Sequence, residues 1–582
     1  MKSILVYMKK YRKEAILAPL FKLLEASFEL MVPLVIASII DVGIGGGDKG
    51  YIMKMCALLV MFAAVGLVVS LTAQFFAAKA ATGYATTLRH EMFKKIQSMT
   101  FSQIDLYGTD TLITRMTSDI NQVQSGVNLF LRLLLRSPFV VAGAMIMAFY
   151  VDSKSAVIFA IVIPILAVVI MAIMLVTIPL YTKLQEKLDV MVTNTRENLT
   201  GAKVIRAFNK EKDEQLKFYE NNKALDKMQQ FTGSISGIMN PLTFVILNGA
   251  TVILIYKGAL RVDTGDLTKG QMISLLNYMS QILVELVKLA NLIIQVTKAV
   301  ACGKRVAGII EIEPDMEDGV KDYPEGDMAV AFNHVSFAYK GSKENALEDI
   351  TFEVKKGSTV GIIGGTGSGK SSLVNLLPRF YDVTEGSISI YGENIKNIKL
   401  DELRKNIGIA LQKSEVFKGT IKDNLKWGDN NASDDAIWEA LEVSQAKEFV
   451  IGKKGDINFN IEQNGRNLSG GQKQRLNIAR AIINKPDILI LDDSASALDF
   501  ATDAKLRMAL NKMNKDMTKF IVSQRSASVQ HADMILVLDN GRLVGKGTHE
   551  ELLESNEVYQ EIYYSQFPKE DNDMLGGVNY AN

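Results

Sequence analysis

Six long apolar stretches in the first half of the chain constrain its fold more than any other feature. They lie at about residues 15–40, 55–78, 133–151, 155–180, 236–257 and 270–297. About 20 apolar residues are enough for a helix to cross a hydrocarbon core of about 30 Å. Residues 55–78 and 155–182 contain no Asp, Glu, Lys or Arg. Helices of soluble proteins rarely stay uncharged over such lengths, so the pattern predicts six transmembrane helices.

Lysine and arginine are distributed unevenly between the segments that join these stretches. The N-terminus and the two long links, with their flanks, hold 22 of them, whereas the opposite side holds six. The positive-inside rule therefore places the N-terminus and both long links in the cytoplasm. Residues 1–13 are basic with apolar residues interleaved, which is typical of a short interfacial helix. The turns of the long links, near 102–114 and 204–212, are expected to contact a cytoplasmic domain.

Several charged residues fall inside the apolar stretches. Lys22, Glu25 and Glu29 share one helix face, and Glu285 and Lys288 are neighbours on another. Intramembrane charges are costly and usually face a cavity or a partner. One interpretation is internal pairing or placement near the headgroups. The other is that Glu25, Glu29 and Glu285 form a substrate cavity that favours cationic, amphipathic cargo.

The second half contains a glycine-rich loop between an apolar strand at 360–363 and a helix at 372–377. The loop comprises Gly364, Gly365, Thr366, Gly367, Ser368, Gly369, Lys370 and Ser371, followed by Ser372. This sequence matches the phosphate-loop pattern at every fixed position. Its backbone N–H groups and the helix N-terminus are expected to surround phosphate oxygens. Lys370 is expected to contact the β- and γ-phosphates and Ser371 to bind Mg²⁺, so the loop predicts ATP-type nucleotide binding.

Length and composition favour a multidomain membrane protein. The chain has 582 residues and a net charge of +1, which implies no bulk attraction to nucleic acid. We expect a polytopic α-helical membrane domain with long cytoplasmic helix extensions, followed by an α/β P-loop NTPase domain. The expected boundaries are 1–310 for the membrane domain, 311–327 for an acidic, proline-containing linker, 328–567 for the nucleotide-binding domain and 568–582 for a disordered tail.

Two further motifs follow the phosphate loop. The apolar strand 488–491 ends in Asp492, an arrangement typical of Mg²⁺ binding beside such a loop. About twenty residues earlier, residues 467–475 have the sequence Asn-Leu-Ser-Gly-Gly-Gln-Lys-Gln-Arg. With these motifs, the chain resembles an ATP-binding cassette (ABC) exporter half-transporter of the type IV fold. The resemblance covers nearly the whole chain, except for the tail after about residue 567.

The resemblance implies roles for further residues. Tyr339 is expected to stack on adenine, and Gln412 is expected to join Ser371 and Asp492 around Mg²⁺. The signature, which acts on ATP bound to a second subunit, comprises Leu468, Ser469, Gly470, Gly471 and Gln472. The D-loop between the two ATP sites comprises Ser496, Ala497, Leu498 and Asp499.

Two positions depart from the family pattern. The residue after the Mg²⁺ aspartate is Asp493 instead of the catalytic glutamate, and Gln524 occupies the place of the switch histidine. Asp493 is one methylene shorter, and a displacement near 1 Å can cost on the order of a hundredfold in rate. Gln524 can form a hydrogen bond to the γ-phosphate but cannot carry an imidazolium charge. These departures beside an intact signature predict a degenerate site in a heterodimer whose partner carries Glu and His; the alternative is a slow homodimer.

The resulting functional hypothesis is one subunit of an ATP-driven exporter in a bacterial plasma membrane. Its expected partners are membrane lipid and small, amphipathic or hydrophobic, drug-like substrates. Alternatives are a lipid or peptide exporter of the same architecture, an importer built on the exporter fold, and an ATP-gated channel or regulator. The last two alternatives are less favoured. The sequence shows no extra domain that would capture substrate for an importer, and no regulatory insertion between the cassette motifs that would suit a channel or regulator.

Overall fold

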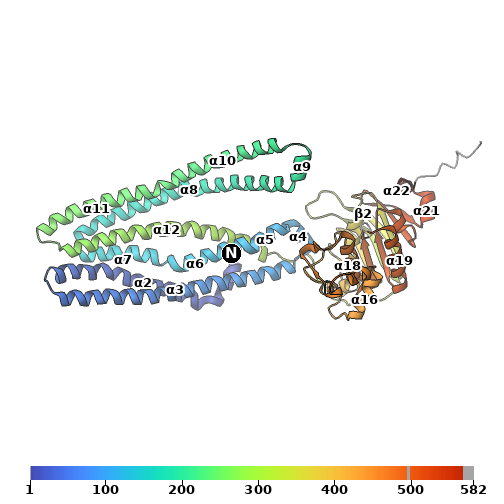
Figure 1. The fold of residues 1–582 in the computed structure, drawn as a ribbon, viewed down its shortest axis with the longest axis horizontal. Coiled ribbons are helices and arrows are strands. Elements are labelled where there is room, and N and C mark those ends of the chain that lie inside the picture. Colours follow the sequence, from blue (N-terminus) through green and yellow to red (C-terminus); the bar gives the residue numbers. More distant parts are fainter. Residues whose placement is uncertain (1, 495–497, 568–582) are drawn as a thin grey trace, which may run out of the picture. The chain divides into compact units, whose positions relative to one another are not determined.

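The structure is a computed structural model that describes residues 2–494 and 498–567 (Figure 1). The chain divides into two compact units, and each unit is made of two separate segments of the sequence. The first unit contains Met1–Gln97 and Thr109–Ile312, and the second contains Ser98–Gly108 and Glu313–Asn582. The short segment Ser98–Gly108 therefore belongs with the C-terminal half of the chain.

The described part of the first unit is helical. Its helices are α1 (Lys2–Leu5), η1 (Val6–Tyr11), α2 (Arg12–Ser38), η2 (Ile39–Ile44), α3 (Lys49–Gln97), α5 (Thr109–Thr114), η3 (Arg115–Asp119), α6 (Ile120–Leu133), α7 (Arg136–Val151), α8 (Ser153–Thr200), α9 (Ala202–Ala207), α10 (Glu211–Gly237), α11 (Met239–Asp263) and α12 (Lys269–Ile310). Within the described residues, six helical runs are long and apolar enough to cross a membrane. This confirms the predicted fold class of the N-terminal half, a multi-pass helical membrane unit.

The long helices pack side by side through small residues. Helix α2 runs along α3, α12 lies against α6 and α7, and α8 lies along α10 and α11 (Figure 1). A Cβ atom at Gly126 of α6 would lie 2.1 Å from the Cβ of Ala299 in α12, so the two backbones approach closely. Small residues permit such contacts between membrane helices. Large apolar side chains such as Val60 and Val68 are exposed on the outside, as expected for helices that face lipid.

The second unit is an α/β fold built around a mainly parallel sheet. Its strands are β1 (Met328–Phe337), β2 (Leu347–Lys355), β3 (Thr359–Gly364), β4 (Glu385–Ile390), β5 (Glu393–Asn394), β6 (Ile407–Ala410), β7 (Gly419–Thr420), β8 (Asn460–Ile461), β9 (Ile488–Asp492), β10 (Thr518–Val522), β11 (Met534–Asp539) and β12 (Arg542–Gly547). In the described residues, the largest sheet has the order β12-β11-β3-β10-β9-β6, with only the β11–β12 pair antiparallel. A second, antiparallel sheet has the order β2-β1-β4-β5.

Helices cover this sheet and connect its strands. They are α4 (Phe101–Tyr107), α13 (Lys370–Asn375), α14 (Leu400–Lys405), α15 (Ile421–Leu425), α16 (Asp434–Val443), α17 (Lys447–Ile451), η4 (Asp456–Asn458), η5 (Gln463–Gly465), α18 (Gly470–Ile482), α19 (Phe500–Met513), α20 (Ser526–Val529), α21 (His549–Ser555) and α22 (Glu557–Gln566). The central strands β3 and β9 are buried along almost their whole length, which is typical of parallel strands covered on both faces. The α/β prediction for the C-terminal half is therefore confirmed.

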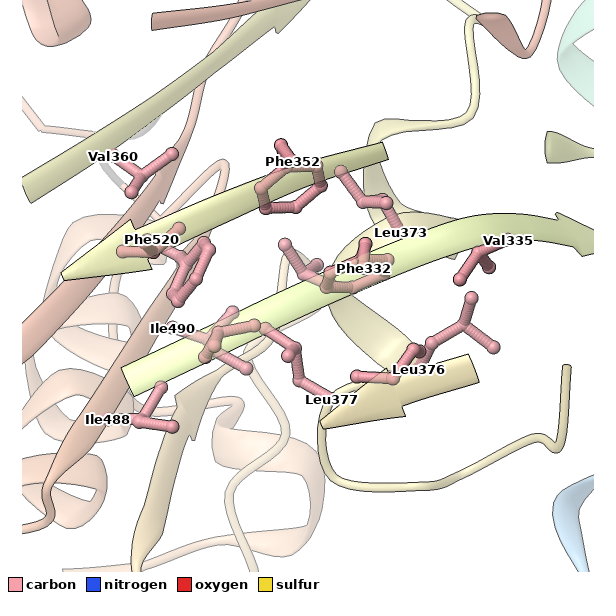
Figure 2. Packing of buried hydrophobic residues seen from close by; sticks show 14 of the residues in the cluster. Phe332, Val335, Phe352, Val360, Leu373, Leu376, Leu377, Ile488, Ile490 and Phe520 are labelled. Atoms are coloured by element: carbon pink, nitrogen blue, oxygen red, sulfur yellow. The ribbon is translucent and has the colours of Figure 1, made fainter. Parts of the chain in front are cut away.

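A single apolar cluster joins the two sheets (Figure 2). The rings of Phe332 and Phe352, from the paired strands β1 and β2, stack with centroids 4.5 Å apart. Leu373 of α13 and Ile490 of β9 belong to the same cluster. Helix α13, which follows the phosphate loop, is therefore held in place by the apolar core of the unit.

The segment Ser98–Gly108 packs on this unit through helix α4. Thr100 caps the helix and forms a reciprocal capping box with Gln103. The Phe101 ring lies 4.6 Å from that of Phe380, centroid to centroid, and the Tyr381 hydroxyl donates to Asp105 at 2.7 Å. A turn of the first long link thus contacts the nucleotide-binding unit through aromatic rings and hydrogen bonds, which include those of Thr100 to Asp315 and of Gln103 to the carbonyl oxygen of Glu313.

We expect Phe352→Ala to destabilise the second unit by about 3–5 kcal/mol, because it leaves a cavity in the buried cluster. Both tryptophans, Trp427 and Trp438, lie in this unit, so tryptophan fluorescence during denaturant unfolding of the full chain reports on it alone. The exposed Met508→Ala is the matched control. An unfolding midpoint equal to that of the control would contradict the assigned core.

Candidate functional site

The phosphate loop lies at the carboxyl edge of the parallel sheet. Strand β3 leads into it, and β10 and β9 follow on one side in parallel register. Carboxyl ends of parallel strands meet at one edge, so the residues that follow β9 and β10 lie beside the loop. These residues include Asp493 and Gln524, which are thus brought next to Lys370 by sheet topology.

The loop backbone depends on glycine at two positions. Gly367 and Gly369 have φ values of +83° and +96°, which side-chain-bearing residues rarely adopt. A Cβ atom at Gly369 would also lie 2.8 Å from the carbonyl oxygen of Ala346. These constraints explain why the loop can fold tightly enough to turn its N–H groups inward.

Lys370 closes the loop from within. Its Nζ donates to the carbonyl oxygens of Gly364 at 3.0 Å and Gly365 at 2.6 Å. Burial lowers the pKa of Lys370, while the nearby carboxylates of Asp493 and Asp492 act in the opposite direction. The ammonium group is thus held at the centre of the loop, where it can meet phosphate oxygens.

Oxygen-bearing side chains suited to Mg²⁺ converge beside the loop. The Ser371 hydroxyl donates to the Asp492 Oδ1 at 3.1 Å, and the Gln412 Nε2 donates to the Asp493 Oδ2 at 3.4 Å. Burial raises the pKa of both Asp492 and Asp493. Hydroxyl, amide and carboxylate oxygens are the donors that Mg²⁺ prefers, so Ser371, Gln412 and Asp492 fit this ion.

These residues line a cavity of about 540 Å³. From the predicted set, its lining contains Tyr339, Thr366, Gly367, Gly369, Lys370, Ser371, Ser372, Gln412, Asp492, Asp493 and Gln524. Gly364, Gly365 and Ser368 lie in the same loop outside this lining. Sequence reasoning missed Glu344, Asn345, Ala346, Val522, Ser523, Asn540 and Gly541. Asn540-Gly541 is a recognisable hairpin turn, but nothing in the sequence indicates that the turn borders the cavity.

Tyr339 also lines this cavity. Its hydroxyl forms a hydrogen bond with the Ser372 hydroxyl at 3.0 Å. The Tyr381 ring packs edge-on against it with centroids 5.3 Å apart. This hydrogen bond directly connects helix α13, which contains Ser372, to the aromatic residue proposed to stack on adenine.

The signature begins helix α18 but lies outside the lining of this cavity. Ser469 caps the helix: its hydroxyl accepts from the Gln472 N–H at 3.3 Å, and its own N–H donates to the Gln472 Oε1 at 3.0 Å. Leu468 is buried, whereas Ser469 and Gly470 are exposed, and a Cβ atom at Gly470 would meet open space. The capped end of α18 is therefore accessible to a second molecule.

Part of the predicted D-loop is described. Ser496 and Ala497 lie outside the described residues. The carbonyl oxygen of Leu498 accepts from the Arg525 Nη1 at 3.3 Å, and the carboxylate of Asp499 caps α19 by accepting from the Thr502 N–H at 2.8 Å. The C-terminal half of this loop is thus tied to the segment that carries Gln524.

In the membrane unit, the three predicted carboxylates each have a basic partner. Lys22 donates to Glu25 at 2.5 Å, and Arg136 donates to Glu29 at 2.6 Å and to Glu285 at 2.5 Å. The buried Glu285 also accepts from Lys288 and from the Ser137 hydroxyl, each at 2.8 Å. Three acidic and three basic side chains thus balance one another.

A cavity of about 310 Å³ adjoins this charge network. Glu29, Gln281, Glu285 and Lys288 contribute to its lining, whereas Glu25 does not. Each of these carboxylates thus has a basic partner, and the lining itself carries charges of both signs, from Glu29, Glu285 and Lys288. The sequence could not show this, because Arg136 lies 149 residues from Glu285.

Comparison with known protein families identifies both halves of the chain. Residues 15–286 match the family described as "ABC transporter transmembrane region", and residues 347–496 match "ABC transporter". The chain is 34% identical to the uncharacterized ABC transporter ATP-binding protein YfiB of Bacillus subtilis, over 98% of this chain and all of that protein.

Other relatives differ in the cargo that their names give. The chain is 31% identical to YgaD of Bacillus subtilis, a candidate multidrug export ATP-binding/permease protein, over 97% of this chain and 99% of that protein. It is 30% identical to the ATP-dependent lipid A-core flippase of Haemophilus influenzae, over 91% and 90% of the two chains. In fold, it is similar to a bacterial Atm1-family ABC exporter with ATP bound, with a TM-score of 0.80 and 21% identity over 96% and 99% of the two chains.

We expect Arg136→Gln to destabilise the membrane unit by about 3–5 kcal/mol, because it leaves Glu285 buried with too little compensating charge. Arg136→Gln/Glu285→Gln should regain part of the loss, since the second change removes that charge. Heating the full chain in detergent and measuring the remaining monodisperse protein by size exclusion checks both. Lys154→Gln, at an exposed lysine, is the control. Equal stability of the single variant and the control would show that the network contributes little.

Proposed function

The chain belongs to the ABC transporter family as a subunit of an ATP-driven exporter, and we propose that it works in a heterodimer whose ATP sites are unequal. In this proposal, its own phosphate loop binds ATP but hydrolyses it poorly. A different second half-transporter carries the catalytic glutamate and switch histidine. The complex lies in a bacterial plasma membrane with the N-terminus and the nucleotide-binding unit in the cytoplasm.

Asp493 is the observation that carries this proposal. It directly follows Asp492 and lines the cavity, where hydrolysis requires a carboxylate to hold and polarise the attacking water. Its side chain is one methylene too short for that task, and its φ of +45° fixes the backbone from which it starts. A shortfall near 1 Å in such a position can lower the rate on the order of a hundredfold.

Gln524 supports the same conclusion. It lies two residues beyond the end of β10 and lines the cavity with Ser523. Its amide can donate a hydrogen bond to a γ-phosphate oxygen, but it cannot provide positive charge to the transition state. Gln524 can thus still contribute to ATP binding, but it stabilises the charge that develops in the transition state of hydrolysis less well than a histidine would.

The signature supports a second chain. Its capped helix end is exposed and lies outside the cavity of its own chain, and family members use this element on the ATP of the opposite subunit. A helix N-terminus favours an anion such as the γ-phosphate. This chain would therefore supply a complete signature to a competent partner site.

The chain's own residues have distinct tasks toward the nucleotide. The loop amides and Lys370 hold phosphates, and Tyr339 stacks on the base. Ser371, Gln412 and Asp492 would hold Mg²⁺, which neutralises phosphate charge when it is bound. Helix α4, which packs on Phe380 and Tyr381, would pass closure of the nucleotide-binding units to the membrane helices.

We propose small amphipathic molecules as cargo, with a lipid as the alternative. The relatives named for multidrug export and for lipid A-core flipping both align with more than 90% of this chain, so their names do not decide between the two. The cavity beside Glu29 and Lys288 combines apolar walls with charges of both signs. Such a lining favours molecules with an apolar body and a neutral or zwitterionic head over simple cations.

For the ATPase, we expect near-zero turnover by this chain alone and strong turnover when it is co-purified with the chain encoded beside it. Asp493→Glu/Gln524→His should raise turnover of this chain's own site at least about tenfold, because both changes restore transition-state contacts. Steady-state phosphate release from detergent-purified protein measures this.

The control for that experiment is Lys370→Ala in the same double variant, which should remove the gain by weakening phosphate binding. Brisk turnover by the unmodified chain alone would contradict the degenerate site and favour a homodimer. A heterodimer whose activity survives loss of the partner's glutamate would contradict the assignment of catalysis to the partner.

For cargo, we expect a zwitterionic amphiphile to stimulate ATPase activity of the reconstituted complex more than a cationic amphiphile of equal chain length. The reason is that Lys288 and Glu29 can each meet one charge of a zwitterion. Lys288→Gln should reduce that preference, since it removes the positive contact, while Lys154→Gln should not. A stronger response to the cation in the unmodified complex would favour the cation-selective interpretation.

A further inference from the structure

The C-terminal helix of the nucleotide-binding unit makes two hydrogen bonds to the segment that carries Gln524. The Gln566 Nε2 donates to the carbonyl oxygen of Gln524 at 2.8 Å. The Gln566 Oε1 accepts from the backbone N–H of Ser526 at 2.9 Å. One side-chain amide therefore spans the connection between β10 and α20, and both of its polar atoms are used.

Helix α22, which presents Gln566, is itself fixed to the strands of the site. Asn556 caps its first turn and donates to the carbonyl oxygen of Val544 in β12 at 2.8 Å. Tyr559 is fully buried in a cluster that contains Ile363, the residue before the phosphate loop. The anchor of Gln566 is thus the same strand, β3, that positions the loop.

We propose that Gln566 is a positioning residue for Gln524. By holding the backbone of residues 524–526, it keeps the Gln524 side chain directed into the cavity, where its amide can meet the γ-phosphate of ATP. Gln524 is exposed, and its neighbours Ser523 and Arg525 are bonded to other segments, whereas Gln566 bonds to the carbonyl group of residue 524 itself and so restricts it most directly. This inference rests on the γ-phosphate role proposed for Gln524.

The positioning role predicts an effect on ATP that is absent for ADP. Only ATP carries the γ-phosphate that Gln524 is proposed to contact, whereas the loop and Lys370 hold the phosphates common to both. A general loss of structure would weaken binding of both nucleotides. The ratio of the two dissociation constants therefore separates positioning from mere support of the fold.

The test uses the purified full chain in detergent with Mg²⁺ and measures Kd for ATP and ADP by calorimetry. Gln566→Met keeps the side-chain length but removes both hydrogen bonds. We expect it to weaken ATP binding about two- to fivefold with ADP unchanged, as for loss of a partly exposed hydrogen bond. Gln566→Glu, which can accept from Ser526 but cannot donate to Gln524, should behave like Gln566→Met.

Gln560→Met is the matched control. Gln560 lies on the same helix, and its Nε2 donates to the carbonyl oxygen of Leu553, away from the cavity. An unchanged ratio of ATP to ADP affinity in Gln566→Met, or an equal loss for both nucleotides, would overturn the proposal. Gln524→Ala tests the premise that Gln524 contacts the γ-phosphate. If this variant leaves the ratio of ATP to ADP affinity unchanged, that premise is wrong and the inference fails with it. This outcome is independent of the ATPase measurements that test the heterodimer.

Discussion

Parallel pairing of β3, β10 and β9 is the constraint on which the nucleotide site depends. Val522 pairs with Ile362 on one side and with Asp492 on the other, so one register fixes three strand ends at once. A shift of one residue would turn every side chain of a strand to the opposite face. Because β3 and β9 are covered on both faces, such a shift would exchange the side chains that pack on the two faces, and neither face would then be filled as closely. The site is therefore specified mainly by residues that never touch nucleotide.

The membrane unit obeys a different constraint. In lipid, apolar side chains gain nothing from facing inward, so close packing and the satisfaction of polar groups determine how its helices associate. The network around Arg136 and Glu285 meets this requirement, because it joins α2, α7 and α12 through paired charges. The adjoining cavity is lined by charges of both signs from the same network. The residues that pair the helices thus overlap with those proposed to select cargo.

Local patterns predicted much of this protein, whereas contacts between distant residues escaped them. Hydropathy located the spans and the loop motif located Lys370, because both are properties of contiguous sequence. The partner of Glu285 lies 149 residues away, and Gln566 lies 42 residues from Gln524. Such pairs are set by tertiary packing and leave no periodic trace in one sequence. The pairing of the charges beside the membrane cavity and the support of Gln524 became visible only from the structure.

The distribution of contacts is consistent with the proposal that this site binds ATP but hydrolyses it poorly. Lys370 is bonded to loop carbonyls and Ser371 to Asp492, so the groups proposed to hold phosphate and Mg²⁺ also hold one another. Their loss would disturb the loop itself. Gln524, by contrast, is an exposed side chain at a strand end, and its backbone is held by Gln566 whatever its side chain is. Because both of these hydrogen bonds of Gln566 go to main-chain atoms, a neutral amide in place of a charged ring at residue 524 would leave this support unchanged.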